Sequence, residues 1–262
     1  MLCILCIGES AMQKFLVTIT AAIMFASLDM PSAAQTLPDA CLALIPDHPL
    51  ATTTPTGKSD WDYWHSQYDS QLSTLAQKPS RTLFLGDSLT HRWPRSIWEG
   101  QFNSLSPVNL GLEQDKTQNL LWRMINGKFL RYSPELVVLL IGTNNNEPPQ
   151  EVAAGIASIV QYVRNNSPKT HIVLLGLLPR SPWKSFEKSH TQLNTLLKEC
   201  QYDVFVHFVD YSTLFLDSSG TPSPSFFQQD GLHLNDEGYA VLLKALEQEP
   251  FVQQAGRGSA NR

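Results

Sequence analysis

Short apolar runs that alternate with segments of helical periodicity constrain the fold of this 262-residue chain more than any other feature. The apolar runs cover residues 82–85, 107–110, 136–141, 171–175 and 204–209. Helical patterns occur near 115–126, 150–165, 185–200 and 236–248. Strands alternating with helices indicate βαβ units, and continuous apolar runs indicate strands buried on both faces. The sequence therefore predicts an α/β fold with a central five-stranded parallel sheet between layers of helices.

A further helix is expected over 59–77, with Ser59 or Asp60 available as its N-cap. Its apolar positions recur every three or four residues: Trp61, Trp64, Tyr68, Leu72 and Leu75. This spacing is typical of an amphipathic helix, and the aromatic stripe is interpreted as core packing. The folded domain is predicted to span 59–250. A Pro/Thr-rich linker, 35–58, would precede it, and a flexible tail without apolar periodicity, 251–262, would follow it.

Polar clusters follow several of the apolar runs, where the chain would leave the sheet. They are Gly86–Leu89, Asn109–Gly111, Gly142–Asn145 and Asp230–His233. In an open parallel sheet, ligands bind at the carboxyl ends of the strands, because the loops there lead into helices. The four clusters are therefore expected to converge on one site.

Three residues of these clusters have the chemistry of a nucleophilic triad. Ser88 would stand exposed at a strand-to-helix turn, near a helix N-terminus. A serine hydroxyl needs a base to accept its proton, and the base needs a third group to hold its tautomer. His233 is the candidate base, and Asp230, three residues earlier, is placed to orient the imidazole through Nδ1. Each residue alone has an ordinary structural interpretation, as a cap or surface group, but their conjunction favours catalysis.

Acyl transfer also needs donors for the oxyanion of the tetrahedral intermediate. The candidates are the backbone N–H groups of Ser88 and Gly111 and the side-chain amide of Asn144. Gly111 is suited to this role because the absence of a side chain lets a substrate approach the backbone. The alternative interpretation of Gly111 and Asn144 is turn chemistry.

These residues are similar to the SGNH, or GDSL, hydrolase superfamily, in which G-D-S-L, N-x-G, G-x-N and D-x-x-H motifs occur in this order. Further stretches resemble the branch that contains the catalytic subunits of intracellular platelet-activating-factor acetylhydrolase: LGDSLTHRWP, NLGLEQDKTQNLLWRMINGKF, SPELVVLLIGTNN, IVLLGLLPR and DGLHLNDEGY. The resemblance spans about Trp61 to Leu246. It implies a flavodoxin-like three-layer α/β/α fold and hydrolysis of short acyl esters without a metal or other cofactor. It also implies Ser88 as nucleophile, Asp230 and His233 as its partners, and Gly111 and Asn144 as oxyanion donors.

The N-terminus is typical of an exported protein, although the branch it resembles is cytosolic. Residues 14–28 are one lysine followed by an apolar stretch, and small residues at 32–34 suit signal-peptidase cleavage. Residues 1–34 are therefore predicted to be a signal peptide, with a retained anchor helix as the alternative. Cys3 and Cys6 would leave with it, and the remaining Cys41 and Cys200 could form one disulfide, which the sequence leaves open.

Composition narrows the function classes. The net charge is −5 and only 16% of residues are charged, so nothing indicates nucleic-acid binding. The chain has no G-x-S-x-G, P-loop or H-E-x-x-H motif, which disfavours a nucleophile-elbow hydrolase, phosphate binding and zinc catalysis.

We therefore expect an exported, periplasmic or secreted, serine esterase that removes short acyl groups from carbohydrates or other small esters. Leu89 and Leu232, each beside a catalytic group, are predicted to narrow its acyl pocket. One alternative is an acyltransferase or accessory factor acting on an exopolysaccharide such as cellulose, since only the second nucleophile differs. Another is a noncatalytic binding protein that keeps the fold. After cleavage of the signal peptide no stable membrane insertion is expected, and the oligomeric state is left open.

Overall fold

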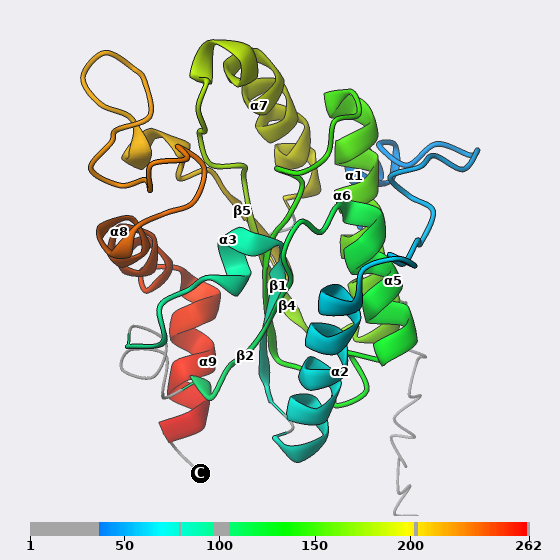
Figure 1. The fold of residues 1–262 in the computed structure, drawn as a ribbon. Coiled ribbons are helices and arrows are strands. Elements are labelled where there is room, and N and C mark those ends of the chain that lie inside the picture. The colour runs from blue at the N-terminus through cyan, green and yellow to red at the C-terminus, as the bar shows by residue number, and fades with distance from the viewer. Residues whose placement is uncertain (1–36, 79, 97–104, 202–203, 261–262) are drawn as a thin grey trace, which may run out of the picture. The chain divides into compact units, whose positions relative to one another are not determined.

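The computed structural model describes residues 37–78, 80–96, 105–201 and 204–260. Its five strands lie parallel in one sheet in the order β2-β1-β3-β4-β5 (Figure 1). They are β1 (Thr82–Gly86), β2 (Val108–Gly111), β3 (Leu136–Leu140), β4 (His171–Leu175) and β5 (Val206–Val209). Each strand falls on one of the apolar runs, so the predicted α/β fold with a five-stranded parallel sheet is confirmed.

The described helices are α1 (Asp39–Leu42), α2 (Asp62–Gln77), α3 (Ser88–His91), α5 (Thr117–Gly127), α6 (Pro149–Asn166), α7 (Trp183–Leu197), α8 (Asp236–Leu246) and α9 (Pro250–Ala260). Of these, α2, α5, α6, α7 and α8 follow the predicted periodicity, whereas α1, α3 and α9 were not predicted. Short 3₁₀ turns occupy Lys198–Cys200 and Ser212–Phe215. The start of α2 differs from expectation, because Trp61 is its N-cap and no side chain caps it there.

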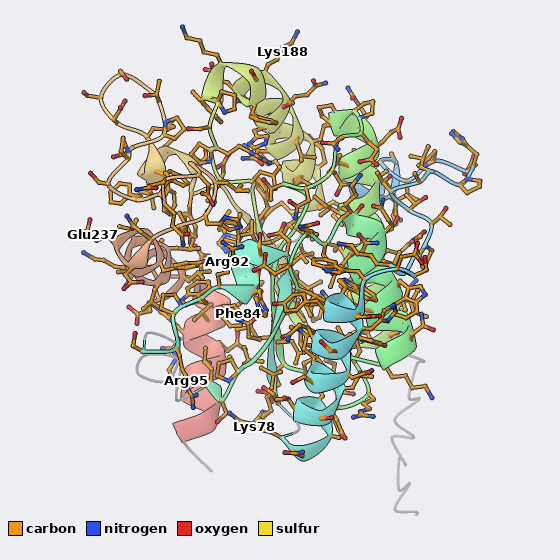
Figure 2. The ribbon with its side chains drawn as sticks, in the orientation of Figure 1. Lys78, Phe84, Arg92, Arg95, Lys188 and Glu237 are labelled. Carbon is orange, nitrogen blue, oxygen red and sulfur yellow. A yellow bond between two sulfur atoms is a disulfide. The ribbon has the colours of Figure 1, made fainter. Side chains whose placement is uncertain are left out.

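Two apolar layers sandwich the sheet. Successive strand residues face opposite sides, so Leu83 and Leu85 of β1 join one cluster while Phe84 joins the other. The first cluster packs under α2, α5, α6 and α7, and the second under α8 and α9. Figure 1 shows these helices on the two sides of the sheet, and Figure 2 shows Phe84 inside while Lys188 and Glu237 point outward. The result is the three-layer α/β/α sandwich that the resemblance implied.

The segment expected to be a linker packs on the domain from residue 37 onward. Cys41 of α1 is fully buried and forms a disulfide with Cys200, which settles the pairing that the sequence left open. Thr52 is fully buried, and its Oγ1 donates to the carbonyl of Glu151 at 2.7 Å. The Oγ1 atoms of Thr53 and Thr54 both donate to the carbonyl of Leu50, at 3.2 and 2.7 Å. The segment predicted to be a linker is therefore part of the folded domain from residue 37 onward.

The expected flexible tail is wrong for residues 251–260, because α9 begins at Pro250 and continues to Ala260. Val252 and Ala255, one helical turn apart, are buried in the second apolar cluster. Two small apolar side chains in a polar segment make too weak a pattern to predict a helix, and the adjoining sheet stabilises it. The predicted signal peptide lies outside the described residues, and within the described part no helix is long and apolar enough to cross a membrane.

Candidate active site

Ser88 begins α3 immediately beyond the carboxyl end of β1. Asp87 is the N-cap of this short helix, and its Oδ1 accepts a hydrogen bond from the Leu89 N–H at 2.9 Å. The cap fixes the direction in which α3 leaves the sheet and hence the position of Ser88. Ser88 is only 3% exposed, so its hydroxyl is held in a defined environment.

The structure brings Ser88, His233 and Asp230 together although Ser88 and His233 are 145 residues apart in sequence. His233 Nε2 lies 2.8 Å from Ser88 Oγ, and His233 Nδ1 lies 2.6 Å from Asp230 Oδ2. With the ring proton on Nδ1 donated to Asp230, Nε2 can accept the proton of the serine hydroxyl. These are the contacts that a Ser-His-Asp nucleophile requires.

Asp230 is itself held by the turn that carries it. Its Oδ1 accepts hydrogen bonds from the N–H groups of Leu232 and His233 at 2.9 and 3.0 Å. Burial opposes ionisation, but these bonds and the one from the His233 ring outweigh it and lower the pKa of Asp230 to about 2. The turn closes through Gly231, which has a φ of 63° that favours glycine. Asp230 is therefore a fixed anion at neutral pH.

Two of the three predicted oxyanion donors, Ser88 and Asn144, each keep an N–H hydrogen that can be donated. Ser88 occupies the first helical position, where a backbone N–H has no partner within the helix. Asn144 follows β3, and its Nδ2 donates one hydrogen to the carbonyl of Asp115 at 3.0 Å. An amide nitrogen carries two hydrogens, so Asn144 keeps a second for a substrate oxygen.

The third predicted donor, Gly111, does not present its N–H to the site. Gly111 lies within β2, and its N–H donates to Oδ1 of Asn109 at 2.9 Å. A Cβ added at Gly111 would stand 2.3 Å from the backbone nitrogen of His91, so glycine is needed here for close packing of α3 on β2. An exposed turn follows β2, and its Gln114 has a φ of 58°. A third donor from this end of β2 would have to come from that turn.

The two predicted acyl-pocket leucines have different environments. Leu89 is 2% exposed and packs in the second apolar cluster beside Phe84 and Trp93, so its side chain belongs to the core. Leu232 is half-buried between Asp230 and His233. Leu232 alone thus remains a candidate for limiting the acyl group.

The sequence analysis assigned no role to Arg180 or Asp87, which also belong to this end of the sheet. Arg180 Nη1 donates to the carbonyl of Thr143 at 2.9 Å, and its guanidinium interacts electrostatically with Asp87 and Asp230. Because Arg180 follows β4, the strand-end rule that singled out the other clusters would have found it. Complete burial raises the pKa of Asp87 to about 7, against the hydrogen bond from Leu89.

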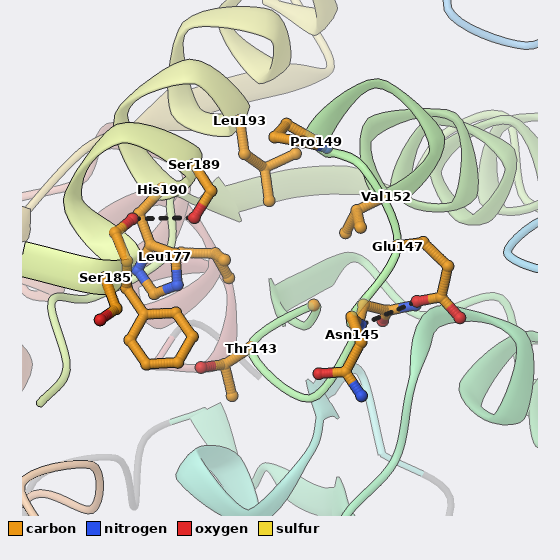
Figure 3. A pocket seen from close by; sticks show the side chains of 13 residues that line it. Thr143, Asn145, Glu147, Pro149, Val152, Leu177, Ser185, Ser189, His190 and Leu193 are labelled. Carbon is orange, nitrogen blue, oxygen red and sulfur yellow. Dashed lines mark hydrogen bonds between the residues drawn. The ribbon is translucent and has the colours of Figure 1, made fainter. Parts of the chain in front are cut away.

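A cavity of about 200 Å³ opens between the loop that carries Asn144 and the helix α7, and Asn144 itself does not line it. Figure 3 shows Thr143 and Asn145, the neighbours of Asn144 in sequence, on one wall and Ser189 and His190 of α7 on another. Val152, Leu177 and Leu193 form its apolar lining. Burial lowers the pKa of His190 to about 4, so this ring is neutral. In the described part of the chain, no three His, Cys, Asp or Glu side chains gather where they could hold a metal ion.

Comparison with known proteins gives a consistent result. Residues 84–241 match the model of the GDSL-like lipase/acylhydrolase family. The platelet-activating factor acetylhydrolase IB subunit alpha1 of Bos taurus is 32% identical over 222 residues, which cover 82% of this chain and 95% of that protein. A GDSL-like lipase from Bacteroides thetaiotaomicron has a similar fold, with a TM-score of 0.59 at 20% identity over 73% of this chain and 98% of that one. An acetyl-xylooligosaccharide esterase from Geobacillus Stearmophilus, in a mutant form, gives a TM-score of 0.53 at 18% identity, covering 66% and 94% of the two chains.

Proposed function

Because the chain belongs to the GDSL-like lipase/acylhydrolase family, and so to a family of ester hydrolases, we propose that it is an exported serine esterase that removes short acyl groups from carbohydrates or other small esters. The observation that carries the proposal is the continuous chain of hydrogen bonds from Ser88 Oγ through the His233 ring to Asp230. A binding protein that had merely kept the fold would not need this geometry.

The contacts define the proposed reaction. Ser88 Oγ attacks the ester carbonyl carbon while His233 Nε2 takes the hydroxyl proton, and Asp230 stabilises the imidazolium that forms. The oxyanion accepts hydrogen bonds from the Ser88 N–H and the Asn144 amide. Collapse of the intermediate breaks the ester bond, and His233 protonates the departing alcohol. Water then attacks the acyl-enzyme by the same steps and releases the carboxylic acid and free Ser88.

Three features support the preference for a short acyl group and a sugar. The first is Leu232, which is half-buried next to His233 in the sequence and would limit the space for an acyl chain. The second is the cavity between the loop of Asn145 and α7, which combines an apolar lining with serine and asparagine side chains, a mixture that suits a small polar molecule. A fold of this kind also carries acetyl-xylooligosaccharide esterase activity in the Geobacillus protein.

Export is supported by two features of different kinds. The first is the lysine and apolar stretch at residues 14–28, followed by small residues at 32–34. The second is the disulfide between Cys41 and Cys200, since such bonds form and persist in oxidising compartments.

The test is turnover of p-nitrophenyl acetate together with labelling by a serine-directed phosphonate. We expect the label on Ser88 and no turnover in Ser88→Ala, whereas Ser66→Ala, on the exposed face of α2, should match the parent protein. Acetate release from acetylated xylooligosaccharides, compared with release from simple alkyl acetates, tests the substrate class. A label on another serine, or folded protein without turnover, would overturn the proposal.

A further inference from the structure

We propose that Trp64, Asp115 and Arg123 form a buried positioning network that sets the orientation of the Asn144 amide. The inference rests on the proposed function, in which Asn144 donates to the oxyanion. Trp64 belongs to α2, which lies before residues 84–241, the part that matches the family model. A helix outside that region would therefore tune the rate of the reaction.

Arg123 is the centre of the network. It is fully buried on α5, and its Nε donates to Asp115 Oδ2 at 2.8 Å. Its Nη1 donates to the carbonyl of Leu110 at the end of β2 and to Gln71 Oε1 of α2, both at 2.9 Å. One guanidinium thus ties the strand end, α2 and Asp115 into a rigid unit, because its donors have a fixed planar geometry.

Asp115 transmits this rigidity to the site. Its side chain is fully buried, with Oδ2 held by Arg123 and Oδ1 accepting from Trp64 Nε1 at 2.6 Å. Its backbone carbonyl accepts the hydrogen bond from Asn144 Nδ2. With the carboxylate fixed at both oxygens, the Asp115 peptide has little freedom to rotate, and the Asn144 amide bonded to it is held in one orientation.

Stability alone does not account for such a network. Burying an ion pair costs desolvation that its attraction only partly recovers, and apolar replacements of similar volume are often as stable or more so. These hydrogen bonds instead fix the position of the groups that they join. Displacing a catalytic donor by about 1 Å can lower the reaction rate on the order of a hundredfold.

Trp64→Phe is the sharpest variant, because it removes the bond to Asp115 while keeping an aromatic ring in the core. Trp122→Phe is its matched control: the two indole rings pack at a tilt with centroids 5.6 Å apart, and Trp122 makes no bond to Asp115 among the contacts of the described residues. We expect Trp64→Phe to lower kcat for p-nitrophenyl acetate by about ten- to a hundredfold with KM nearly unchanged. Trp122→Phe should leave both constants near the parent values, and thermal melts confirm that both variants are folded.

A double-mutant cycle with Asn144→Ala separates positioning from a general loss of packing. Asn144→Ala alone should lower kcat by about 10²–10³-fold, and Trp64→Phe should then cause no further loss. An equal loss from Trp64→Phe in both backgrounds, or equal losses from the two tryptophan variants, would overturn the network. Retention of full kcat by Asn144→Ala would instead overturn the oxyanion assignment of the proposed function, and the network with it.

Discussion

Replacing Asp230 by asparagine should stop catalysis by fixing the wrong imidazole tautomer. In the parent protein, Asp230 Oδ1 accepts two backbone N–H groups and Oδ2 faces His233 Nδ1. An asparagine in the same place can satisfy those N–H groups only with its carbonyl oxygen. Its NH₂ group must then point at Nδ1 and donate to it, which moves the ring proton to Nε2. In that state His233 cannot accept the proton of Ser88.

The size of the effect follows from this geometry. Loss of the correct tautomer in a Ser-His-Asp system costs about 10⁴-fold in kcat, which is about 5 kcal/mol of transition-state stabilisation. Asp230→Ala neither enforces the wrong tautomer nor supports the right one, so it should lose less than Asp230→Asn. Because the pKa of Asp230 is lowered to about 2, its carboxylate stays ionised from pH 5 to 8, so Asp230 of the parent protein keeps one charge state over that range.

The assay is steady-state hydrolysis of p-nitrophenyl acetate by the three proteins over that pH range, with thermal melts to show that each is folded. An Asp230→Asn variant within about tenfold of the parent would refute the tautomer argument, since that factor is only about 1.4 kcal/mol. So would an Asp230→Ala variant more damaged than Asp230→Asn.

Three further predictions concern the acyl pocket and stability. With p-nitrophenyl esters, kcat/KM should fall about ten- to hundredfold from acetyl to butyryl, because steric overlap of the longer acyl chain with the pocket costs about 1–3 kcal/mol. Leu232→Ala should recover much of this loss. A parent kcat/KM that rises from C2 to C8 esters would mean an open groove. Stability should fall as pH rises from about 4 to about 7, because folded Asp87, with its pKa raised to about 7, keeps a proton that the unfolded chain has released. At about 1.4 kcal/mol per pKa unit, this loss of stability is worth about 4 kcal/mol. Asp87→Asn keeps the side-chain oxygen that caps α3 but cannot ionise, so it should abolish the loss. Melting temperatures of parent and variant that change in the same way from pH 4 to 8 would contradict the prediction. Reducing the Cys41–Cys200 disulfide, whose ends are 159 residues apart, should lower the free energy of unfolding by about 2–5 kcal/mol. The measurements are a lower melting temperature and two new titratable thiols. An unchanged melting temperature after complete reduction would show that the disulfide adds no stability.

The amino-acid pattern was enough to predict the architecture and the candidate triad. Strands such as β3 and β4 are short apolar runs, and in helices such as α6 apolar residues recur every three to four positions. Both kinds of element can therefore be recognised from neighbouring residues. The parallel sheet then brings strand ends to one edge. Ser88 and the Asp230–His233 turn could therefore be assigned to one site although they are far apart in the chain.

Which groups in that site are free to act depends on contacts that form when the chain folds. Gly111 was predicted to donate its N–H to the substrate, but Oδ1 of Asn109 accepts that hydrogen. Leu89 was predicted to line the acyl pocket, but its side chain lies in the core. The helix α9 exists because the sheet buries Val252, a stabilisation that no local pattern encodes. Likewise, the hydrogen bond between Trp64 and Asp115 cannot be predicted from the sequence, because a bond between distant segments leaves no periodic pattern of residues. Periodicity is a property of adjacent residues, whereas the occupancy of a donor or the burial of a side chain depends on partners that only folding brings close.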